Sequence, residues 1–516
     1  MLTILLFFLL TLPAAWAQRE TADAALTNKP TDFSTTILDP GTAIHDVTIP
    51  EFKPTDIPLG LVPAAVPEIP SATNIATPRP RPRPYQTNSP FGSNFITIPT
   101  AKDLATRTVE IVAPPLPPIN APPQGSPEPP PVEAVATNSA KSYFVATAGN
   151  DAADGSEDTP WRTIQKAAAS AQPGDVVTVL PGTYEAFHTV NAGETNRPIT
   201  FRADGQVIIV PLGGEAPTGL QPKTMAEIYR VDNIHVRDTD NIIIDGFHVQ
   251  RAGRTGISVI ESRNVIVRNN VVGPSGRFGI FTGFAPGVQI ISNKTFGAAI
   301  EHGIYVSNSR VTNDNPVIRY NETFGNARNG IQLNGDCAAG GDGSLTGALL
   351  EGNIVRDNGM KGLSLISMSD SVVQNNLIYN NGKFAGAGGI HLTDEIGCGK
   401  ASSGNVIVNN TVVEPRIACI RITDGATNNI IFNNLLVGSR PVVDEVGGNQ
   451  IDTDSNIRLD SAIGIFNNSE ASDYRPLLTS PAKNAGVGVY REKRAPLLDR
   501  EGQRRRTALG FDAGAY

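Results

Sequence analysis

Cysteine, long apolar runs and an excess of positive charge are all missing from this sequence, and each absence excludes a class of protein. The 516 residues include only three cysteines, whose spacing does not suit a zinc site. After residue 17 no stretch approaches the roughly 18 apolar residues of a membrane-spanning helix, so we expect no membrane insertion. The 42 basic and 50 acidic residues give a net charge of −8, so we expect no nucleic acid partner. No Ser/His/Asp motif or phosphate-binding loop is visible.

The first 17 residues have the features of a secretory signal. An apolar run at 4–12 is followed by Pro13 and by an A-x-A cleavage site at 15–17, although no Lys or Arg precedes the run. A membrane anchor would need a longer apolar run. We therefore expect residues 1–17 to be a signal peptide and the protein to be secreted or periplasmic.

Residues 18–140 differ in composition from the rest of the chain. They are rich in Pro, Thr and Ala and contain an Arg-Pro repeat at 79–84. Such a segment buries too little apolar surface to fold, so we expect a disordered, partly polyproline linker. It could serve as a spacer, or its Arg-Pro repeat could be a ligand for an aromatic groove. The folded domain is expected at 141–516.

A Gly-Ile pair or a close variant recurs between residues 245 and 438, at spacings of 23 to 32 residues. An asparagine that closes a short β-branched run recurs between the pairs. The pairs are Gly256-Ile257, Gly279-Ile280, Gly303-Ile304, Gly330-Ile331, Gly362-Leu363, Gly389-Ile390 and Cys419-Ile420, and the asparagines are Asn270, Asn293, Asn321, Asn353, Asn376, Asn410 and Asn434. Repeats of this length indicate a solenoid, and runs that leave no room for a helix indicate stacked β coils.

The repeated residue types predict a right-handed parallel β-helix, an all-β fold. Strand residues alternate inward and outward, and equivalent positions of successive coils stack at about 4.8 Å. We expect the asparagines to occupy left-handed turn positions and to form a hydrogen-bonded ladder. We expect the glycines to provide a bend at the start of each strand.

The two ends of the folded domain carry different motifs. Before the repeats stand Gly149-Asn150-Asp151, Pro160-Trp161 and a helical stretch at 163–169, which we expect to cap the solenoid before its first strand. Residues 202–230 are expected to be an insertion, and the segment after Gly438 is expected to be a C-terminal cap.

These end motifs resemble those of bacterial secreted right-handed β-helix proteins, the pectate-lyase-like family. The resemblance covers about residues 142–516 and rests on capping and turn motifs. It implies the β-helix fold and an activity on acidic polysaccharides, often with calcium. The Asp-Pro-His-Glu motif of alginate C5-epimerases is absent.

One outward face of the repeats is expected to form a polar strip exposed to solvent. The residue after each Gly-Ile pair points outward and gives the row Ser258, Phe281, Tyr305, Gln332, Ser364, His391 and Arg421. Long loops at 336–346, 382–388 and 395–404 flank its later part. Such a strip suits an extended sugar chain, so a polysaccharide is the expected partner.

Lyase chemistry on a uronate needs a base and a positive charge, and the strip offers both. The candidate catalytic residues are His391, Arg421, Lys361 and Tyr305. The candidate substrate-binding residues are His302, Gln332, Asn334, Ser364 and Thr393. A polysaccharide lyase is the favoured function; a glycoside hydrolase and a non-catalytic glycan-binding scaffold remain alternatives.

Acidic residues and two cysteines gather just after the strands of the strip. Asp336, Asp394 and Glu395 are candidate ligands for calcium, with Asp342 and Asp424 close by, although Asp also favours turns. Cys337 and Cys398 lie in loops two coils apart and either form a disulfide or stay free. Cys419 is expected in the core.

Overall fold

The structure is a computed structural model that describes residues 139–214, 224–308, 310, 313–395, 397–398, 400–505 and 510–516. The expected signal peptide lies outside the described residues, as does nearly all of the expected linker. None of the helices formed by the described residues could reach across a bilayer.

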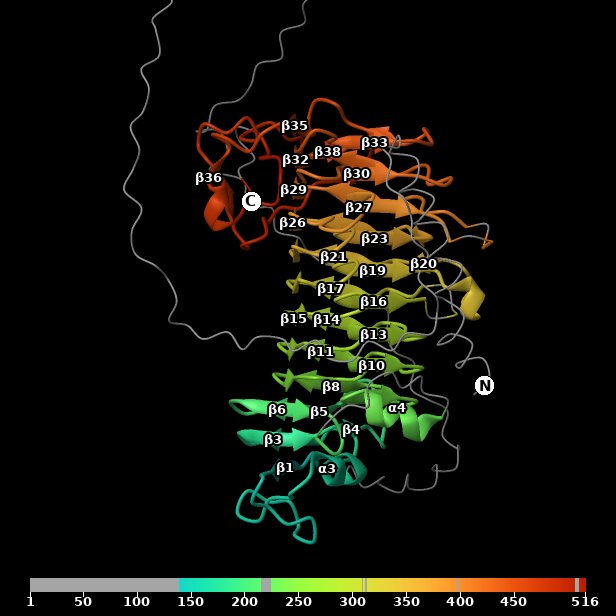
Figure 1. Ribbon diagram of the computed structural model, residues 1–516, viewed down its shortest axis with the longest axis vertical. Coiled ribbons are helices and arrows are strands. Elements are labelled where there is room, and N and C mark those ends of the chain that lie inside the picture. The colour runs from blue at the N-terminus through green and yellow to red at the C-terminus, as the bar shows by residue number, and fades with distance from the viewer. Residues whose placement is uncertain are drawn as a thin grey trace, which may run out of the picture. The chain divides into compact units, whose positions relative to one another are not determined.

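Three long parallel sheets form the body of the described part of the chain, and successive strands of the chain alternate between them (Figure 1). Sheet I consists of β1 (Ser142–Val145), β2 (Val176–Val179), β5 (Ile199–Ala203), β8 (Ile242–Asp245), β11 (Ile266–Arg268), β14 (Gln289–Ile291), β17 (Val317–Arg319), β21 (Leu349–Glu351), β25 (Val372–Gln374), β28 (Val406–Val408), β31 (Ile430–Phe432) and β34 (Gln450–Ile451). Sheet II consists of β4 (Phe187–His188), β7 (Ile234–Arg237), β10 (Thr255–Ile260), β13 (Phe278–Gly283), β16 (Ile304–Ser307), β19 (Ile331–Asn334), β23 (Leu363–Ile366), β27 (Gly388–Thr393), β30 (Ala418–Ile422) and β33 (Val442–Asp444). Sheet III consists of β3 (Gly182–Glu185), β6 (Val207–Val210), β9 (His248–Val249), β12 (Val271–Val272), β15 (Lys294–Phe296), β18 (Glu322–Phe324), β22 (Ile354–Arg356), β26 (Leu377–Tyr379), β29 (Thr411–Val413), β32 (Leu435–Val437) and β35 (Ile457–Leu459).

The remaining elements are short. The helices are α3 (Ile164–Ser170), α4 (Met225–Val231), η1 (Cys337–Ala339) and η2 (Ser469–Ala471). Three further strand pairs are β20 (Leu345–Thr346) with β24 (Met368–Ser369), β36 (Phe466–Asn468) with β37 (Asp473–Pro476), and β38 (Val489–Tyr490) with β39 (Lys493–Arg494).

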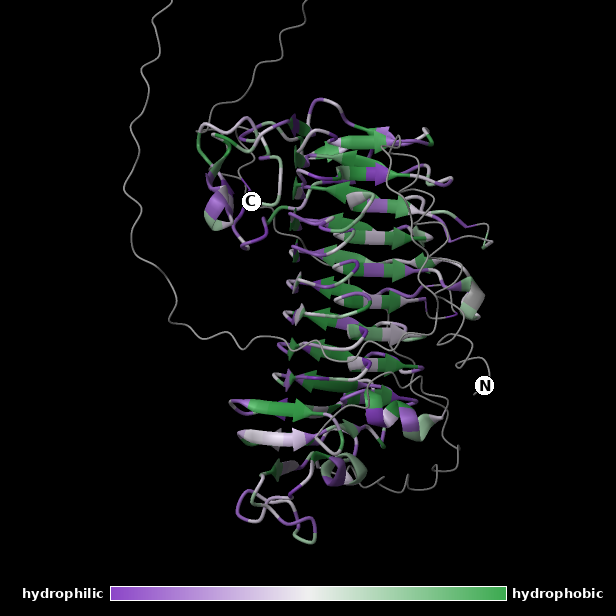
Figure 2. Ribbon diagram, in the orientation of Figure 1, coloured by the Kyte–Doolittle hydropathy of each residue, from purple (hydrophilic) through white to green (hydrophobic). Residues whose placement is uncertain are grey.

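The interior of the coils is an apolar column. In sheet II the isoleucine or leucine of each repeat pair stacks on its equivalent in the next strand, as Ile304 does on Ile331. These side chains are fully buried in one continuous cluster that also takes in sheets I and III. Figure 2 shows mainly apolar strands, with polar residues recurring within the strands of sheet II. The alternation that the sequence predicts is therefore present, with the polar partners on the outer side.

The predicted asparagine ladder runs from Asn270 to Asn434 and continues to Asn456. At Asn353, for example, Nδ2 donates to Oδ1 of Asn376 at 2.9 Å and to the carbonyl of Ile318 at 2.9 Å. Oδ1 of Asn353 accepts from the backbone and side chain of Asn321, both at 3.0 Å. The left-handed residue, however, is the one before each ladder asparagine, such as Asn375 at φ 56°. The sequence-based assignment of the turn was therefore one residue off.

The repeat glycines are required by close approach and not by a bend. A β-carbon on Gly330 would collide with the side chains of Val355 and Asn358, and Gly330 has no left-handed φ. The coil interior is too narrow there for any side chain.

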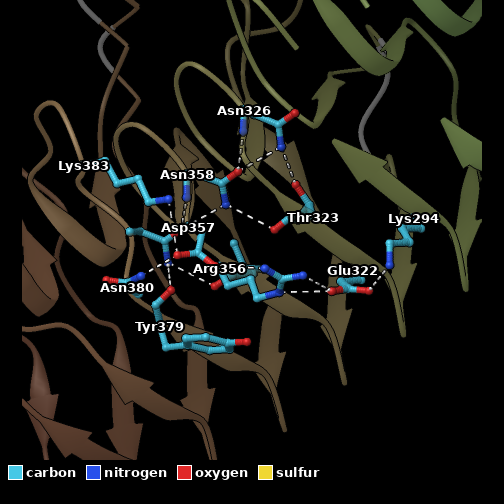
Figure 3. A network of polar contacts seen from close by, with 12 residues as sticks. Lys294, Glu322, Thr323, Asn326, Arg356, Asp357, Asn358, Tyr379, Asn380 and Lys383 are labelled. Carbon is cyan, nitrogen blue, oxygen red and sulfur yellow. Dashed lines mark hydrogen bonds and ion pairs between the residues drawn. The ribbon is translucent and has the colours of Figure 1, made fainter. Parts of the chain in front are cut away.

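A second, shorter ladder ends in a buried acid. In this ladder each asparagine hydrogen-bonds to the next, in the order Asn326, Asn358 and Asn381. Figure 3 shows the first two. The nearby charges on the outer side of sheet III are paired with one another, as Arg356 is with Glu322 at 2.7 Å. Glu414 takes the last position and accepts from Asn381 at 2.7 and 2.9 Å. Burial raises the pKa of Glu414 to about 8.

We expect Glu414 to make the protein less stable as the pH rises. Its pKa is about 8 in the folded chain against 4.5 ordinarily, so the folded state holds a proton that the unfolded state loses between those values. Stability should fall by up to about 1.4 kcal/mol per pH unit in that window and level off above it. Glu414→Gln should flatten part of the decline in Tm between pH 5 and pH 9, and the exposed Glu157→Gln should not. Equal slopes for both variants would contradict the assignment.

The structure revises the expected ends of the domain. Helix α3 follows β1 and does not precede the first strand. The expected insertion at 202–230 contains strand β6 and most of helix α4. After Gly438 the coils continue through β33, β34 and β35. Much of the following segment packs against the outer sides of sheets I and III, where Phe511 joins Phe432 and Ala513 joins Leu435.

Candidate functional site

Sheet II places the outward residues of the repeats in one row, in register. Tyr305 pairs with Gln332, Gln332 with Ser364, Ser364 with His391, and His391 with Arg421. We call this row, from Tyr305 to Arg421, the strip. The order that the sequence predicts is the order in the structure.

The strip is not the solvent-exposed surface that the sequence predicts. Tyr305, Gln332, Ser364 and His391 are 0–5% exposed, and only Arg421 is partly exposed. Large side chains on strands about 4.8 Å apart cover one another. The loop that contains η1 adds to this, because its Ala339 packs in one cluster with Phe281 and Tyr305. Burial of this kind depends on long-range packing, which local periodicity does not report.

At its first end the strip holds a buried tyrosine and carboxyl pair. The Tyr305 hydroxyl donates to Asp336 at 2.8 Å, and Asn334 donates to the same carboxyl at 2.7 Å. Burial, together with the charge of Glu395, raises the pKa of Asp336 to about 8. Burial also raises the pKa of Tyr305 well above its usual value, so the phenol keeps its proton.

Two long loops beside this end are joined covalently. Cys337 follows β19 and Cys398 follows β27, and the two form a disulfide with their Cα atoms 5.8 Å apart. Glu395 strengthens the link, because its carboxylate accepts from the backbone of Cys337 at 2.9 Å. Cys419 is buried and free, as expected. The sequence left the pairing open because loop conformation sets the distance between the sulfurs.

A second polar group lies where the strands of the strip begin. His302 accepts from the backbone of Asn329 at 3.1 Å, and the Asn329 side chain donates to Gln332 at 2.7 Å and accepts from the Lys361 backbone at 3.0 Å. Burial lowers the pKa of His302 well below its usual value, and the charges of Arg328, Lys361 and Arg277 act in the same direction. His302 is therefore a neutral imidazole beside a buried lysine.

The last third of the strip holds His391 and Arg421. Nε2 of His391 lies 3.0 Å from the Thr423 hydroxyl. Thr423 and Thr393 each donate to Asp424 at 2.8 Å. The Arg421 guanidinium is bound to Glu445 at 2.8 and 2.9 Å. Between this group and Gln332, the buried Ser364 hydroxyl has no hydrogen-bond partner among the described residues.

The expected calcium ligands do not converge on one point. Within the described residues, one set of three potential ligand side chains lies close together, Cys337, Glu395 and Cys398, and its sulfurs are bonded to each other. Asp394 belongs instead to a hairpin, where it pairs with Ala401. Asp336 already accepts from Tyr305 and Asn334. The residues therefore do not fit a preformed calcium site.

The outward row extends below Ser258 to two histidines that the sequence analysis missed. His235 pairs with Ser258, and His188 pairs with His235. Ser258, His235 and Asp232 meet there, but Ser258 and Asp232 both bond to Nδ1 of His235. A nucleophilic triad needs the serine at the other nitrogen, so this group is not one. An Ile-His-Val run resembling those of the later strands was the available signal.

Comparisons with known proteins support the fold. The family model described as a right handed beta helix region matches residues 227–341 and 291–463. The uncharacterized protein YwoF of Bacillus subtilis (strain 168) is 26% identical over 243 residues, which are 46% of this chain and 46% of that protein. This chain thus spans about half the length of the curated relative it matches.

A solved structure supports the same fold. A pectate lyase, Pel9A, aligns with a TM-score of 0.53 and 15% identity over 73% of this chain and 96% of its own. A rhamnogalacturonan lyase aligns with a TM-score of 0.39 and 16% identity over 60% of this chain and 87% of its own. The right-handed parallel β-helix that the repeats predict, and the likeness to pectate-lyase-like proteins, are confirmed as statements about the fold.

Proposed function

We propose that this right-handed parallel β-helix cleaves an acidic polysaccharide by β-elimination along the strip. One observation carries the proposal: His391 and Arg421 are in register on neighbouring strands, so a base and a cation stand about 4.8 Å apart at the backbone. The likeness of fold to a pectate lyase supports the same class of substrate. A substrate outside the cytoplasm agrees with the export signal expected at residues 1–17.

The reaction removes a proton from the sugar carbon beside the carboxylate. The electrons of that C–H bond form a C=C bond, the neighbouring C–O bond breaks, and the departing oxygen takes up a proton. We assign His391 as the base and Arg421 and Lys361 as the cations that stabilise the carboxylate as negative charge develops. Arg421 would exchange its bond to Glu445, which is partly exposed, for one to the substrate.

The other strip residues are assigned to substrate binding. Tyr305 lies three strand spacings from His391, or about 14 Å, so the two do not share a reaction centre. The sugar units on one side of the bond that breaks would contact Tyr305, His302, Gln332 and Asn334. The units next to that bond would contact Ser364 and Thr393.

We propose calcium only as a cofactor that the substrate helps to bind. The carboxylates in place do not form a cation site by themselves, so any calcium would need oxygen ligands from the substrate. No step above depends on it. Activity with calcium and with a chelator decides the matter.

A glycoside hydrolase is the second candidate, favoured by the carboxyl pair at Asp336 and Glu395. The pKa of Asp336 is about 8, so it would be a protonated acid beside a second carboxyl group, an arrangement that hydrolysis of a glycosidic bond uses. Asp336 and His391 are both buried, so burial does not separate the two candidates.

A panel of polysaccharides separates these functions. The protein is incubated with pectate, alginate and glycosaminoglycans, either with calcium or with a chelator. The masses of the products are then measured by mass spectrometry. β-Elimination gives a new end that lacks one water relative to the hydrolytic product and absorbs in the ultraviolet. We expect such ends from at least one acidic polymer. Saturated ends would favour the hydrolase, and binding without cleavage would favour a scaffold.

A further inference from the structure

A cavity of about 880 Å³ lies outside the coils near the N-terminal end of sheet II. Its walls come from α3, from β3 and β4, and from α4. The same helix separates it from the strip. Ile228 of α4 packs in the cluster of Phe281 and Tyr305, whereas Tyr229 contacts His188 and His235. The cavity is therefore a separate site.

One residue at the cavity, His235, is buried and held in one orientation. His235 is 1% exposed, and its Nδ1 is engaged by the Ser258 hydroxyl at 2.5 Å and by Asp232 at 3.4 Å. Asp232 is fixed in turn by Arg254. Nε2 of His235 has no hydrogen-bond partner among the described residues. Burial lowers the pKa of His235, so the ring is neutral and, with a proton on Nδ1, Nε2 accepts.

The wall and the rim add two further features. The rings of His188 and Tyr229 stack in parallel with centroids 4.2 Å apart and form a flat wall. Arg162 and Arg230 also line the cavity, and both are exposed and make no ion pair with any described residue. A fitting ligand has a flat face for the rings and an anionic group for the arginines.

We propose that this cavity binds a single uronate sugar unit. The sugar ring lies against the wall formed by Tyr229 and His188, and the carboxylate meets Arg230 and Arg162. The volume lies within the range of small-molecule sites, about 300–1,000 Å³. The identity of the ligand rests on the proposed function, since uronates are the units of the polymer that the strip would cleave. The existence of the cavity does not depend on that function.

Titration calorimetry of the full chain tests the proposal with free galacturonate, glucuronate, galactose and glucose. We expect one uronate per chain and at least tenfold weaker binding of the hexoses. Arg230→Gln should weaken uronate binding about tenfold or more and leave hexose binding unchanged, because only the carboxylate contact is lost. Tyr229→Ala should weaken both. The exposed Arg458→Gln is the matched control and should bind as the wild type does.

The strip variant His391→Ala keeps this test independent of the proposed function. Uronate binding should persist in His391→Ala even if cleavage is lost, and cleavage should persist in Arg230→Gln. Binding that survives Arg230→Gln and Tyr229→Ala but disappears in His391→Ala would place the sugar on the strip and overturn the proposal. Equal binding of hexoses and uronates, or no binding of any, would also overturn it.

Discussion

Alanine in place of His391 is expected to lower kcat on the polysaccharide identified by the panel by about 10²- to 10⁴-fold, the usual contribution of a general base. His391 is the only described imidazole in register with a cation on the next strand. The matched control is His248→Ala, which removes a histidine from the outer side of sheet III and should leave kcat unchanged.

Stability has to be measured beside activity, because His391 is buried. The sequence alone predicts an exposed residue whose replacement costs at most about 0.5 kcal/mol, but a side chain that is 5% exposed should cost about 1 kcal/mol or more. A folded His391→Ala protein with wild-type kcat would exclude His391 as the base.

Arg421→Gln should raise KM as well as lower kcat, because the substrate carboxylate meets Arg421 before and during the reaction.

The largest effect on stability is expected at the centre of the asparagine ladder. Asn353→Ala removes the acceptor for two donors of Asn321 and the donor to Ile318, all of them buried. Leaving several buried groups unpaired should cost roughly 3–5 kcal/mol. Equilibrium unfolding in urea should therefore show a clearly lower midpoint than for the wild type.

The control for the ladder is Asn196→Ala, since Asn196 is exposed and should change stability by no more than about 0.5 kcal/mol. Equal midpoints for the two variants would show that the ladder adds no stability. Because each coil contacts only its neighbours, a variant in the middle of the stack should weaken the coils on both sides of it.

The fold could be predicted from the sequence because its determinants are local and repeated. A β-branched residue at every second position, a glycine where the coil is too narrow for a β-carbon and an asparagine at each turn recur in coil after coil. The left-handed position was misplaced by one residue because several different residue types occupy it, among them Ser292, Tyr320 and Asn375.

The site was predicted less completely because it depends on contacts between distant segments. Register alone gave the order of the strip, and alternation gave its outward direction. Three features depend on loops or helices whose paths the sequence does not specify. They are the burial of Tyr305, the carboxyl pair at Asp336 and Glu395, and the cavity beside His235. The sequence predicts an insertion at 202–230 and gives no sign that helix α4 contacts Phe281 or forms a wall of the cavity.

The central claim is that an acidic sugar chain lies along sheet II between Tyr305 and Arg421. A crystal structure of the His391→Ala protein with an oligosaccharide of the identified polymer tests it most directly. The account predicts sugar density across β16, β19, β23, β27 and β30, with one carboxylate at Arg421 or Lys361. Density on the outer side of sheet I or sheet III, with the strip empty, would contradict it.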